Sequence, residues 1–333
     1  MDQSNRIALD VMGGDSAPAC NLDGALLAVE RGVAPERLLL VGRESEIRAG
    51  LEERGGDPGF GILHAEEVIG MDEKPAVALR GKPGSSISVA TGAVKAGLAG
   101  AHVSMGNTGA VVGAATVGLK TLEGVRRPGI AVTVRLTGKP VTILDMGANV
   151  VPKAEHLVHY GHMGAVLMRD VVKSDKARVA LMNIGEESTK GTDLLREAHE
   201  ALSASQLDFV GNIESNEIFS DRAEVVVTDG FTGNVVLKLM EGFSKFLLGL
   251  VGREMAQHGA DWAPELLGSV RKKVDYSEYG GALLLGVRGV VVIGHGRSDP
   301  HAVSNAIDLA GRALDADVNG KIVQGLASGA SPV

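Results

Sequence analysis

Three segments of the sequence place short polar side chains beside glycines, directly after apolar runs. They are residues 10–15 (DVMGGD), 104–110 (SMGNTGA) and 145–149 (DMGAN). Glycine lets the backbone approach a ligand closely, and a helix that begins after such a turn offers unpaired N–H groups to an anion. A single glycine turn after a strand is most often only a turn, but three in one chain favour a phosphate site. The candidate phosphate-binding residues of the first two turns are Gly13, Gly14, Asp15, Asn107 and Thr108.

A fourth segment, residues 80–86 (RGKPGSS), precedes a helical stretch. In one interpretation a serine of this segment is simply the N-cap of that helix. In the other, the hydroxyls, the N–H groups of the helix and a basic side chain converge on a phosphate. The residues concerned are Ser85, Ser86, Arg80 and Lys82. The sequence leaves both interpretations open.

Lys190 lies in residues 183–191 (NIGEESTKG), a polar stretch that follows a predicted strand. Its ammonium could stabilise an oxyanion or a phosphate, and the alternative is an ordinary solvated lysine.

Residues 211–217 (GNIESNE) and 228–234 (TDGFTGN) also place polar groups after apolar runs, where loops often carry functional side chains. Asp229 and Asn234 either contact a ligand or only cap turns and the next helix. Glu214 is a weaker candidate for substrate contact, and so is His295, which is either an acid or base or a structural histidine.

Several familiar catalytic motifs are missing from the sequence. It contains no Walker phosphate loop, no GxGxxG after the first predicted strand, no HExxH and no GxSxG. Cys20 is the only cysteine, so neither a disulfide framework nor a zinc site of several thiolates can form within the chain. We expect a protein without metal or cofactor that does not need a nucleophile of its own.

The 333 residues carry a formal net charge of -8 at pH 7, with 44% apolar and 22% charged residues. This balance is typical of a globular protein, and its sign argues against a protein that binds nucleic acid over its whole surface. The apolar runs fall short of the roughly 18 residues of a membrane-spanning helix. The first residues lack the pattern of a secretory signal, so we expect a protein of the reducing cytosol.

Short apolar runs alternate with helical stretches, which is typical of α/β proteins. The predicted strands are residues 6–10, 37–41, 102–105, 178–184, 209–213, 223–229 and 290–295. Near-continuous apolar runs indicate parallel strands with both faces buried, whereas residues 130–136 and 141–146 are predicted to form a hairpin. We expect a three-layer α/β/α sandwich with a mostly parallel, mixed sheet.

No linker divides the chain, so we expect one α/β/α catalytic unit over residues 1–318 and a flexible tail over residues 319–333. An amphipathic helical insertion is predicted near residues 235–275. Its apolar stripe could pack in the core, form a dimer seam or lie on a bilayer surface. The stripe residues proposed for membrane or dimer contact are Phe246, Leu247, Leu248, Leu250 and Val251. The basic cluster at residues 271–273 is a candidate dock for anionic lipid or an acidic partner.

Together these segments resemble the phosphate acyltransferase (PlsX) family of bacterial phospholipid synthesis. The matching motifs occur in order over about nine tenths of the chain. They lie at residues 8–15, 85–86, 106–110, 145–149, 185–187, 190–191, 214, 216–217, 229–234, 279–282 and 295–296. Met105, Val151 and Gly161 depart from the family pattern.

The resemblance implies a fold like that of isopropylmalate dehydrogenase and phosphotransacetylase, and transfer of a fatty acyl group from an acyl carrier protein thioester to inorganic phosphate. Phosphate is largely dianionic near neutral pH, so positioning should dominate catalysis. The residues expected to hold phosphate are Arg80, Ser85, Ser86, Asn107 and Thr108. Those expected to stabilise charge at the acyl carbonyl are Lys190 and Asn149, oriented by Asp145, Asp229 and Asn234.

The resemblance also implies a cytosolic homodimer that visits the membrane surface, where a membrane-bound glycerol-3-phosphate acyltransferase uses the acyl phosphate. Two other functions stay open, a phosphotransacetylase-like enzyme that uses a coenzyme A thioester and a non-catalytic membrane scaffold. A dehydrogenase is disfavoured because the dinucleotide signature is missing.

Overall fold

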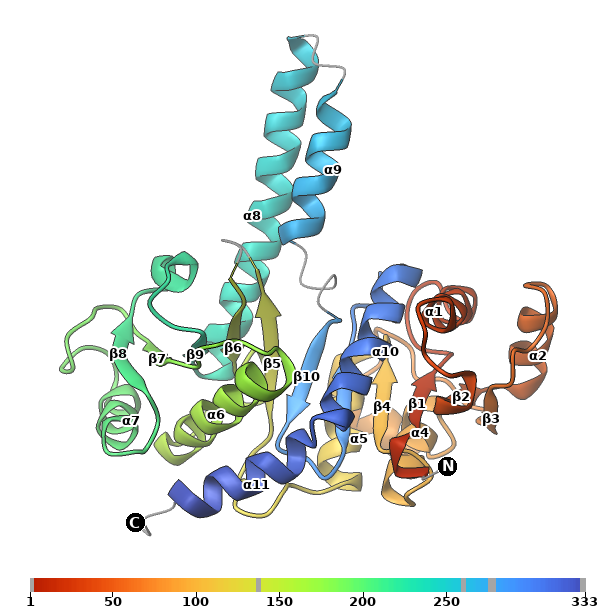
Figure 1. Cartoon of the computed structure of the whole chain (residues 1–333), viewed down its shortest axis with the longest axis horizontal. Helices are drawn as coiled ribbons and strands as arrows, with labels where there is room; N and C mark the ends of the chain where they lie inside the picture. Colours follow the sequence, from red (N-terminus) through yellow and green to blue (C-terminus); the bar gives the residue numbers. More distant parts are fainter. Residues whose placement is uncertain (1–2, 136–138, 259–261, 275–279, 330–333) are drawn as a thin grey trace. The chain divides into compact units, whose positions relative to one another are not determined.

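The computed structural model describes residues 3–135, 139–258, 262–274 and 280–329, without the side chains at positions 263, 271–274 and 329. The chain forms two compact units (Figure 1). The first comprises residues 1–128 and 279–333, and the second comprises residues 129–278. The basic cluster predicted at residues 271–273 lies outside the described side chains.

The strands of the first unit lie in the order β3-β2-β1-β4-β11-β10. All neighbours are parallel except β10, which runs antiparallel to β11. The strands are β1 (Ile7–Asp10), β2 (Leu38–Gly42), β3 (Gly61–His64), β4 (Ala101–Ser104), β10 (Ala282–Leu285) and β11 (Val290–Ile293). Every residue of β1, β2 and β4 is buried, so both faces of the sheet are covered.

Helices α1 and α10 pack against each other, and α4 packs against α5 and the strands β1 and β4. The α-helices of the first unit are α1 (Ala19–Glu30), α2 (Glu44–Glu52), α3 (Pro75–Gly81), α4 (Ser86–Lys95), α5 (Thr108–Gly118), α10 (Pro300–Asp315) and α11 (Val318–Gly329). Short 3-10 helices span Gln3–Asn5 and Pro35–Arg37. Asp299 starts α10, since its side chain accepts the Ala302 N–H at 2.8 Å and proline occupies the first turn.

The strands of the second unit lie in the order β5-β6-β9-β7-β8. They are β5 (Gly129–Val134), β6 (Val141–Leu144), β7 (Val179–Met182), β8 (Phe209–Ile213) and β9 (Val225–Val227). The pair β5 and β6 is the predicted antiparallel hairpin, and the other pairs are parallel. The helices are α6 (Ala154–Val166), α7 (Asp193–Ser203), α8 (Gly230–Gln257), α9 (Ala263–Val274), a π-helix at Leu167–Val171 and a 3-10 helix at Ser215–Phe219.

Helices α8 and α9 lie side by side and extend away from the strands of the second unit (Figure 1). A Cβ at Gly252 of α8 would lie 3.0 Å from Leu267 of α9, so the two helices approach closely there. None of the described helices is both long enough and apolar enough to span a bilayer.

The structure differs from the sequence analysis in three elements. The strands β3 and β10 were not predicted from the sequence. Residues 319–329, which we expected to be a tail, belong to helix α11, where Val318, Ile322 and Leu326 are buried at steps of four. The extent of the catalytic unit stays a prediction.

Candidate functional site

A buried carboxylate, that of Asp10 at the end of β1, connects the first two glycine turns. The Ser104 hydroxyl donates to Asp10 Oδ2 at 2.7 Å, and the Met12 N–H donates to Asp10 Oδ1 at 3.1 Å. The Ser104 oxygen accepts the Gly106 N–H at 3.0 Å. Burial raises the pKa of Asp10, and hydrogen bonds from Ser86 and Ser104 oppose this rise. Asp10 therefore links the loops after β1 and β4 to the start of α4.

The first glycine turn is also held by Asn21 of α1. Asn21 Nδ2 donates to the carbonyls of Val11 and Gly13, at 2.8 Å each. A Cβ at Gly13 would lie 2.7 Å from the Gly106 nitrogen, so glycine is what lets the two turns approach. Gly14 has a φ of 103°, which L side chains rarely adopt.

The loop after β11 meets the same edge of the first unit, because the Asp15 N–H donates to the Gly296 carbonyl at 2.7 Å. The Arg297 N–H donates to Nδ1 of His295 at 3.1 Å, so this ring nitrogen is an acceptor. The loops that carry Gly13, Gly14, Asp15 and His295 are thus brought together at the carboxyl ends of parallel strands, where ligands bind in open α/β sheets.

Ser85 is the N-cap of α4. Its hydroxyl oxygen accepts the Ser88 N–H at 3.4 Å, and its O–H group donates to the Ser88 hydroxyl oxygen at 2.9 Å. Ser85 and Ser86 are both buried, whereas Arg80 is exposed and its Nε donates to the Ala76 carbonyl at 2.9 Å. Capping is therefore one use of Ser85 in this structure, and phosphate contact by these residues stays a prediction.

Asn107 is the N-cap of α5 and also holds the loop before α3. Its Oδ1 accepts the Ala110 N–H at 3.1 Å. Its Nδ2 lies 3.3, 3.1 and 3.1 Å from the carbonyls of Gly70, Met71 and Glu73. The carboxamide hydrogens are therefore committed to backbone, and a direct bond to phosphate would require Asn107 to release a carbonyl.

The same loop is closed by an ion pair. Lys82 Nζ donates to the Glu73 carboxylate at 2.5 Å and to the Val68 carbonyl at 2.8 Å. The hydrogen bond from Lys82 lowers the pKa of Glu73. Thr108, the first residue of α5, is exposed and its phosphate contact stays a prediction.

In the second unit, the Asp145 carboxylate gathers the turn after β6. Its oxygens accept the backbone N–H groups of Ile130, Gly147, Ala148 and Asn149 at 2.7 to 3.0 Å and the Asn149 Nδ2 at 3.3 Å. Burial raises the pKa of Asp145, and these backbone hydrogen bonds oppose the rise. With so many donors bound, the carboxylate serves to position the turn.

The first helical turn of α8 packs on the loop after β6 that Asp145 organises. Asp229 is the N-cap of α8 and accepts a backbone N–H of the helix at 2.9 Å. The Gly230 N–H donates to the Asn149 carbonyl at 2.9 Å. A Cβ at Gly147 would lie 3.6 Å from Asn234 Cβ. The structure therefore brings together four of the predicted residues, namely Asp145, Asn149, Asp229 and Asn234.

Lys190 and Glu214 lie on the loops that follow β7 and β8, which are neighbouring parallel strands. Both residues are exposed. The aliphatic part of Lys190 lies over Gly185, where a Cβ would come within 3.1 Å of Lys190 Cγ. The catalytic role of Lys190 and the substrate contact of Glu214 stay predictions.

Three residues that organise these turns, in one unit or the other, were missed in the sequence. Asp10 and Ser104 were quoted within motifs, and their signal was a polar residue at the end of an otherwise apolar strand. Tyr160 of α6 accepts a hydrogen bond from Asn149 Nδ2 at 2.8 Å. It is fully buried, and nothing in the sequence connects it to Asn149. Among the residues that the structure describes, no group of three or more His, Cys, Asp or Glu could hold a metal ion.

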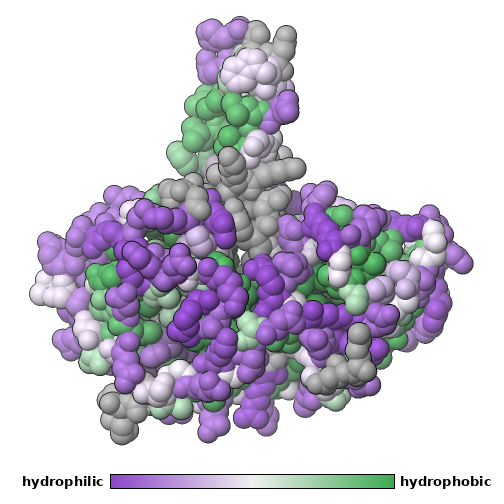
Figure 2. All heavy atoms as spheres, in the orientation of Figure 1, coloured by the Kyte–Doolittle hydropathy of each residue, from purple (hydrophilic) through white to green (hydrophobic). Residues whose placement is uncertain are grey.

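Helix α8 presents an apolar stripe to solvent, and Figure 2 shows apolar residues gathered on the helical projection. Its most exposed members are Leu239 (67%), Phe246 (59%) and Phe243 (57%), followed by Leu247, Leu250 and Val251. Leu248, predicted as part of this contact, is only half-exposed. Most of the stripe is therefore not part of the core of this chain, which leaves a partner protein or a bilayer surface as its predicted contact.

A family model described as fatty acid synthesis protein matches residues 5–321. A phosphate acyltransferase of Endomicrobium trichonymphae is 44% identical over 311 residues, which cover 90% of this chain and 91% of that protein. A phosphate acyltransferase of Heliobacterium modesticaldum is 45% identical over 312 residues, which cover 92% of each chain.

Solved structures of two phosphotransacetylases are similar to this fold. The enzyme of Streptococcus pyogenes superposes with a TM-score of 0.61 at 19% sequence identity, over 94% of this chain and 95% of that chain. A phosphotransacetylase of Staphylococcus aureus gives a TM-score of 0.60 at 14% identity, with 94% and 95% covered. The likeness confirms the predicted fold class, a three-layer α/β/α fold with a mixed, mostly parallel sheet.

Proposed function

This chain belongs to the fatty acid synthesis protein family, and on that premise we propose that it transfers a fatty acyl group from an acyl carrier protein thioester to inorganic phosphate. The reaction is reversible and forms acyl phosphate for phospholipid synthesis. The observation that carries the proposal is the identity of 44% and 45% to two phosphate acyltransferases over nine tenths or more of the chain.

In the proposed reaction a phosphate oxygen attacks the thioester carbonyl carbon. A tetrahedral intermediate forms with negative charge on the former carbonyl oxygen, the C–S bond then breaks, and the carrier protein leaves as its thiolate. Phosphate is itself the nucleophile, and a thiol of pKa about 8.5 is a good leaving group near neutral pH. Catalysis therefore requires mainly that the two substrates are held in line and that the oxyanion is stabilised.

The turns of the first unit are suited to hold phosphate. Helices α4 and α5 both begin beside the loop that Asp10 and Ser104 organise, so their unpaired N–H groups and positive dipole ends lie near one another. Residues Gly13, Gly14, Asp15, Arg80, Ser85, Ser86 and Thr108 are proposed to contact the anion or to shape the loops around it, with a weaker contribution from His295. Glu214, on the loop after β8 of the second unit, is proposed only as a weaker candidate for substrate contact. Asn107 contributes by holding the loop before α3 and by capping α5.

The second unit supplies the groups proposed to act on the acyl carbonyl. Lys190 brings a positive charge, and Asn149 brings a carboxamide whose Nδ2 donates to Asp145 and Tyr160. To donate to the oxyanion, Asn149 must release one of these two hydrogen bonds, and the longer one, to Asp145, is the one proposed to open. Asp229 and Asn234 lie at the start of α8, which packs on the same turn. Asp145, Asp229 and Asn234 are therefore proposed as positioning residues.

We propose further that the protein is a cytosolic homodimer that associates peripherally with the membrane surface. There it would deliver acyl phosphate to a membrane-bound glycerol-3-phosphate acyltransferase in a transient encounter. The exposed stripe of α8 supports such a contact, because large apolar side chains lie there in solvent. Five side chains of this size, each worth about 1.5–3 kcal/mol when buried, would support reversible attachment.

The decisive experiment incubates the full chain with a long-chain acyl carrier protein thioester, with and without inorganic phosphate, and detects acyl phosphate by mass spectrometry. We expect phosphate-dependent formation of acyl phosphate. Formation only from a coenzyme A thioester run in parallel would overturn the choice of donor in favour of a phosphotransacetylase-like enzyme. No product from either donor, with binding to vesicles retained, would overturn the enzymatic proposal in favour of a membrane scaffold.

A further inference from the structure

The backbone turn that ends at Lys190 is held by two buried asparagines. The Lys190 N–H donates to the Glu187 carbonyl at 3.1 Å, which closes the turn. Asn212 Nδ2 donates to the same Glu187 carbonyl at 2.9 Å, and Asn183 Nδ2 donates to the Lys190 carbonyl at 3.1 Å. Side chains therefore fix the first and the last carbonyl of the turn, while the two residues between them are exposed.

The two asparagines come from neighbouring strands. Asn183 directly follows β7, and Asn212 belongs to β8. The register of this strand pair shifts between Val179 and Leu181, so that β8 has one residue more than β7 over this stretch, and Gly211 has a φ of 90°. Such a bulge redirects the side chain that follows it. The bulge in β8 thus directly precedes Asn212, the polar side chain that bonds the Glu187 carbonyl of the Lys190 turn.

Asn212 gives up a hydrogen bond to make this contact. The residue is 1% exposed, and among the described residues its buried Oδ1 has no hydrogen-bond partner. A buried acceptor without a partner destabilises the fold, whereas leucine would fill similar space without this cost. The position therefore uses asparagine for its donor, and that donor bonds the Glu187 carbonyl.

Asn183 is built into the turn more completely. Its Oδ1 accepts the Ile184 N–H at 2.8 Å while its Nδ2 bonds the Lys190 carbonyl. Gly191 then leaves the turn with a φ of 85°, and a Cβ there would collide with Asn183 Oδ1. One carboxamide thus fixes both the entry and the exit of the loop.

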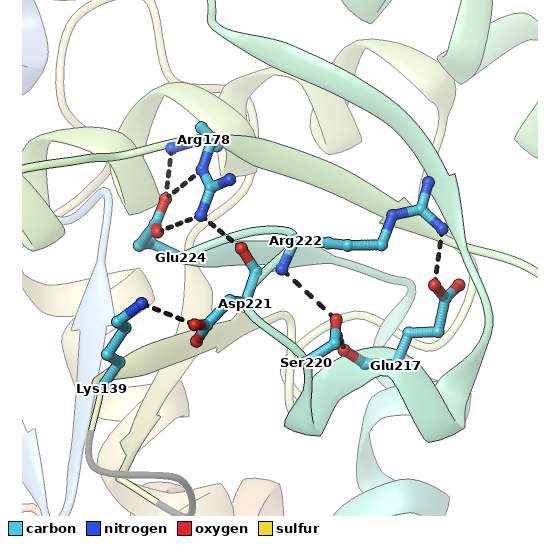
Figure 3. A network of polar contacts seen from close by, with 7 residues as sticks. All are labelled: Lys139, Arg178, Glu217, Ser220, Asp221, Arg222 and Glu224. Atoms are coloured by element: carbon cyan, nitrogen blue, oxygen red, sulfur yellow. Dashed lines mark hydrogen bonds and ion pairs between the residues drawn. The ribbon is translucent and has the colours of Figure 1, made fainter.

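Besides the two asparagines, an exposed ion pair also holds the segment beside the Lys190 turn. Arg222 lies 3.2 Å from the Glu186 carboxylate, beside the turn, and also pairs with Glu217, as Figure 3 shows for the second pair. Exposed ion pairs contribute little, so the buried asparagines are the stronger constraint on the backbone of Lys190.

We propose that Asn183 and Asn212 are positioning residues, which hold the Lys190 ammonium at the point where negative charge develops on the acyl carbonyl oxygen. This inference rests on the proposed function. A lysine side chain is long and flexible, so a fixed backbone is what limits where its ammonium can reach. A displacement of about 1 Å can cost on the order of a hundredfold in rate.

The test compares Asn212→Leu and Asn183→Ala, each alone and combined with Lys190→Ala. We expect each asparagine substitution to lower kcat about tenfold or more while KM for phosphate changes less than about twofold. In the Lys190→Ala background the same substitutions should change kcat less than about twofold, because the group they position is gone. Equal losses with and without Lys190 would overturn the inference.

Glu224→Gln is the matched control. Glu224 is buried and pairs with Arg178 at 2.6 Å beside the amino end of β7, the end of that strand away from Asn183 (Figure 3). The Glu224→Gln variant should have a lower free energy of unfolding and an unchanged kcat. If it lost as much kcat as the asparagine variants, their loss would be explained by lower stability alone, and the inference would be overturned.

Amide hydrogen exchange over residues 185–191 separates this inference from the proposed function. Asn212→Leu should raise exchange there, and Glu224→Gln should leave it unchanged. If the wild-type protein forms no acyl phosphate, the proposed function fails, and the exchange still shows whether the asparagines hold the turn. Unchanged exchange in both asparagine variants would overturn the inference even in an active enzyme.

Discussion

Asp10 at the end of β1 and Asp145 directly after β6 organise their turns in the same way, since each buried carboxylate accepts N–H groups from the residues that follow it. Burial raises the pKa of both carboxyl groups, and hydrogen bonds oppose the rise. Each carboxylate therefore replaces its lost hydration by donors of the turn that it shapes. These hydrogen bonds offset part of the cost of burying the charge, and they fix the geometry of each loop at a strand end.

The raised pKa of Asp10 has a direct consequence for stability. Between the unfolded value of 3.8 and the higher folded value, the folded state binds more protons than the unfolded state, so the free energy of unfolding falls as pH rises through that window. Asp10→Asn has no such titration. In urea unfolding across this range, the free energy of unfolding of the variant minus that of the wild type should increase as pH rises, by up to about 1.4 kcal/mol per pH unit. A constant difference between the two proteins would contradict the assignment.

The titration of His102 in β4 should change stability with pH in the opposite direction to that of Asp10. Burial lowers its pKa from 6.5 to about 4, and its Nε2 is buried without a hydrogen-bond partner among the described residues. The unfolded state therefore binds the extra proton between these values, and stability is lost as pH falls from 6.5 towards 4. The loss for this group should reach about 3 kcal/mol. We expect His102→Leu to lack this part of the acid sensitivity in chemical unfolding measured at both ends of the window.

Asn107→Ala should release the loop before α3. The substitution removes the contacts of Nδ2 with three loop carbonyls and the cap of α5. Loss of an N-cap costs about 1 kcal/mol, and the loop contacts add to this loss. Amide exchange over residues 69–74 should rise, and KM for phosphate should rise because the start of α5 is no longer fixed. Exchange that rises while KM stays unchanged would remove this helix end from the phosphate site.

The sequence predicted where polar residues gather because a change from apolar to polar residues marks each strand end locally. It could not predict which of these residues bond one another, since the bonds join distant positions. Asp10 and Ser104 are 94 residues apart, Asn107 and Gly70 are 37 apart, and Asn212 and Glu187 are 25 apart. The strand order that joins them is set by the packing of whole elements. Asn107 illustrates the result, because its motif did not reveal that its carboxamide holds backbone, and its contact with phosphate stays a prediction.

Helix α11 was missed for a different reason. Val318, Ile322 and Leu326 do recur at steps of four, but the glycines and other small residues between them have weak helix preferences, which made the segment resemble a tail. By contrast, the stripe of α8 was predicted well, because its period of three and four residues is entirely local.

Lys190→Ala should lower kcat by about a hundredfold to a thousandfold if the ammonium stabilises the oxyanion, with little change in KM for phosphate. Lys190 is exposed, so thermal unfolding should be nearly unchanged. Lys190→Arg keeps the charge but changes the geometry of the donors and should recover only part of the activity. Steady-state kinetics with the carrier protein thioester measure both variants. Full activity of Lys190→Ala would exclude this lysine from the mechanism.

The stripe of α8 offers the clearest separation of catalysis from membrane contact. Phe246 is 59% exposed and Leu250 is 38% exposed, so an aspartate at either position should change the free energy of unfolding by only about 0.5 kcal/mol. Binding to vesicles of anionic lipid should fall, because each substitution removes a large apolar side chain from the bilayer and adds a repelled charge. Turnover of the soluble thioester should remain at the wild-type level.

Ala256→Asp, exposed on α8 outside the stripe, adds the same charge and should retain most of the vesicle binding. If all three variants bind vesicles equally well, the stripe contacts a protein partner and not the bilayer. If the stripe variants then sediment as monomers where the wild type sediments as a dimer, that partner is a second copy of this chain.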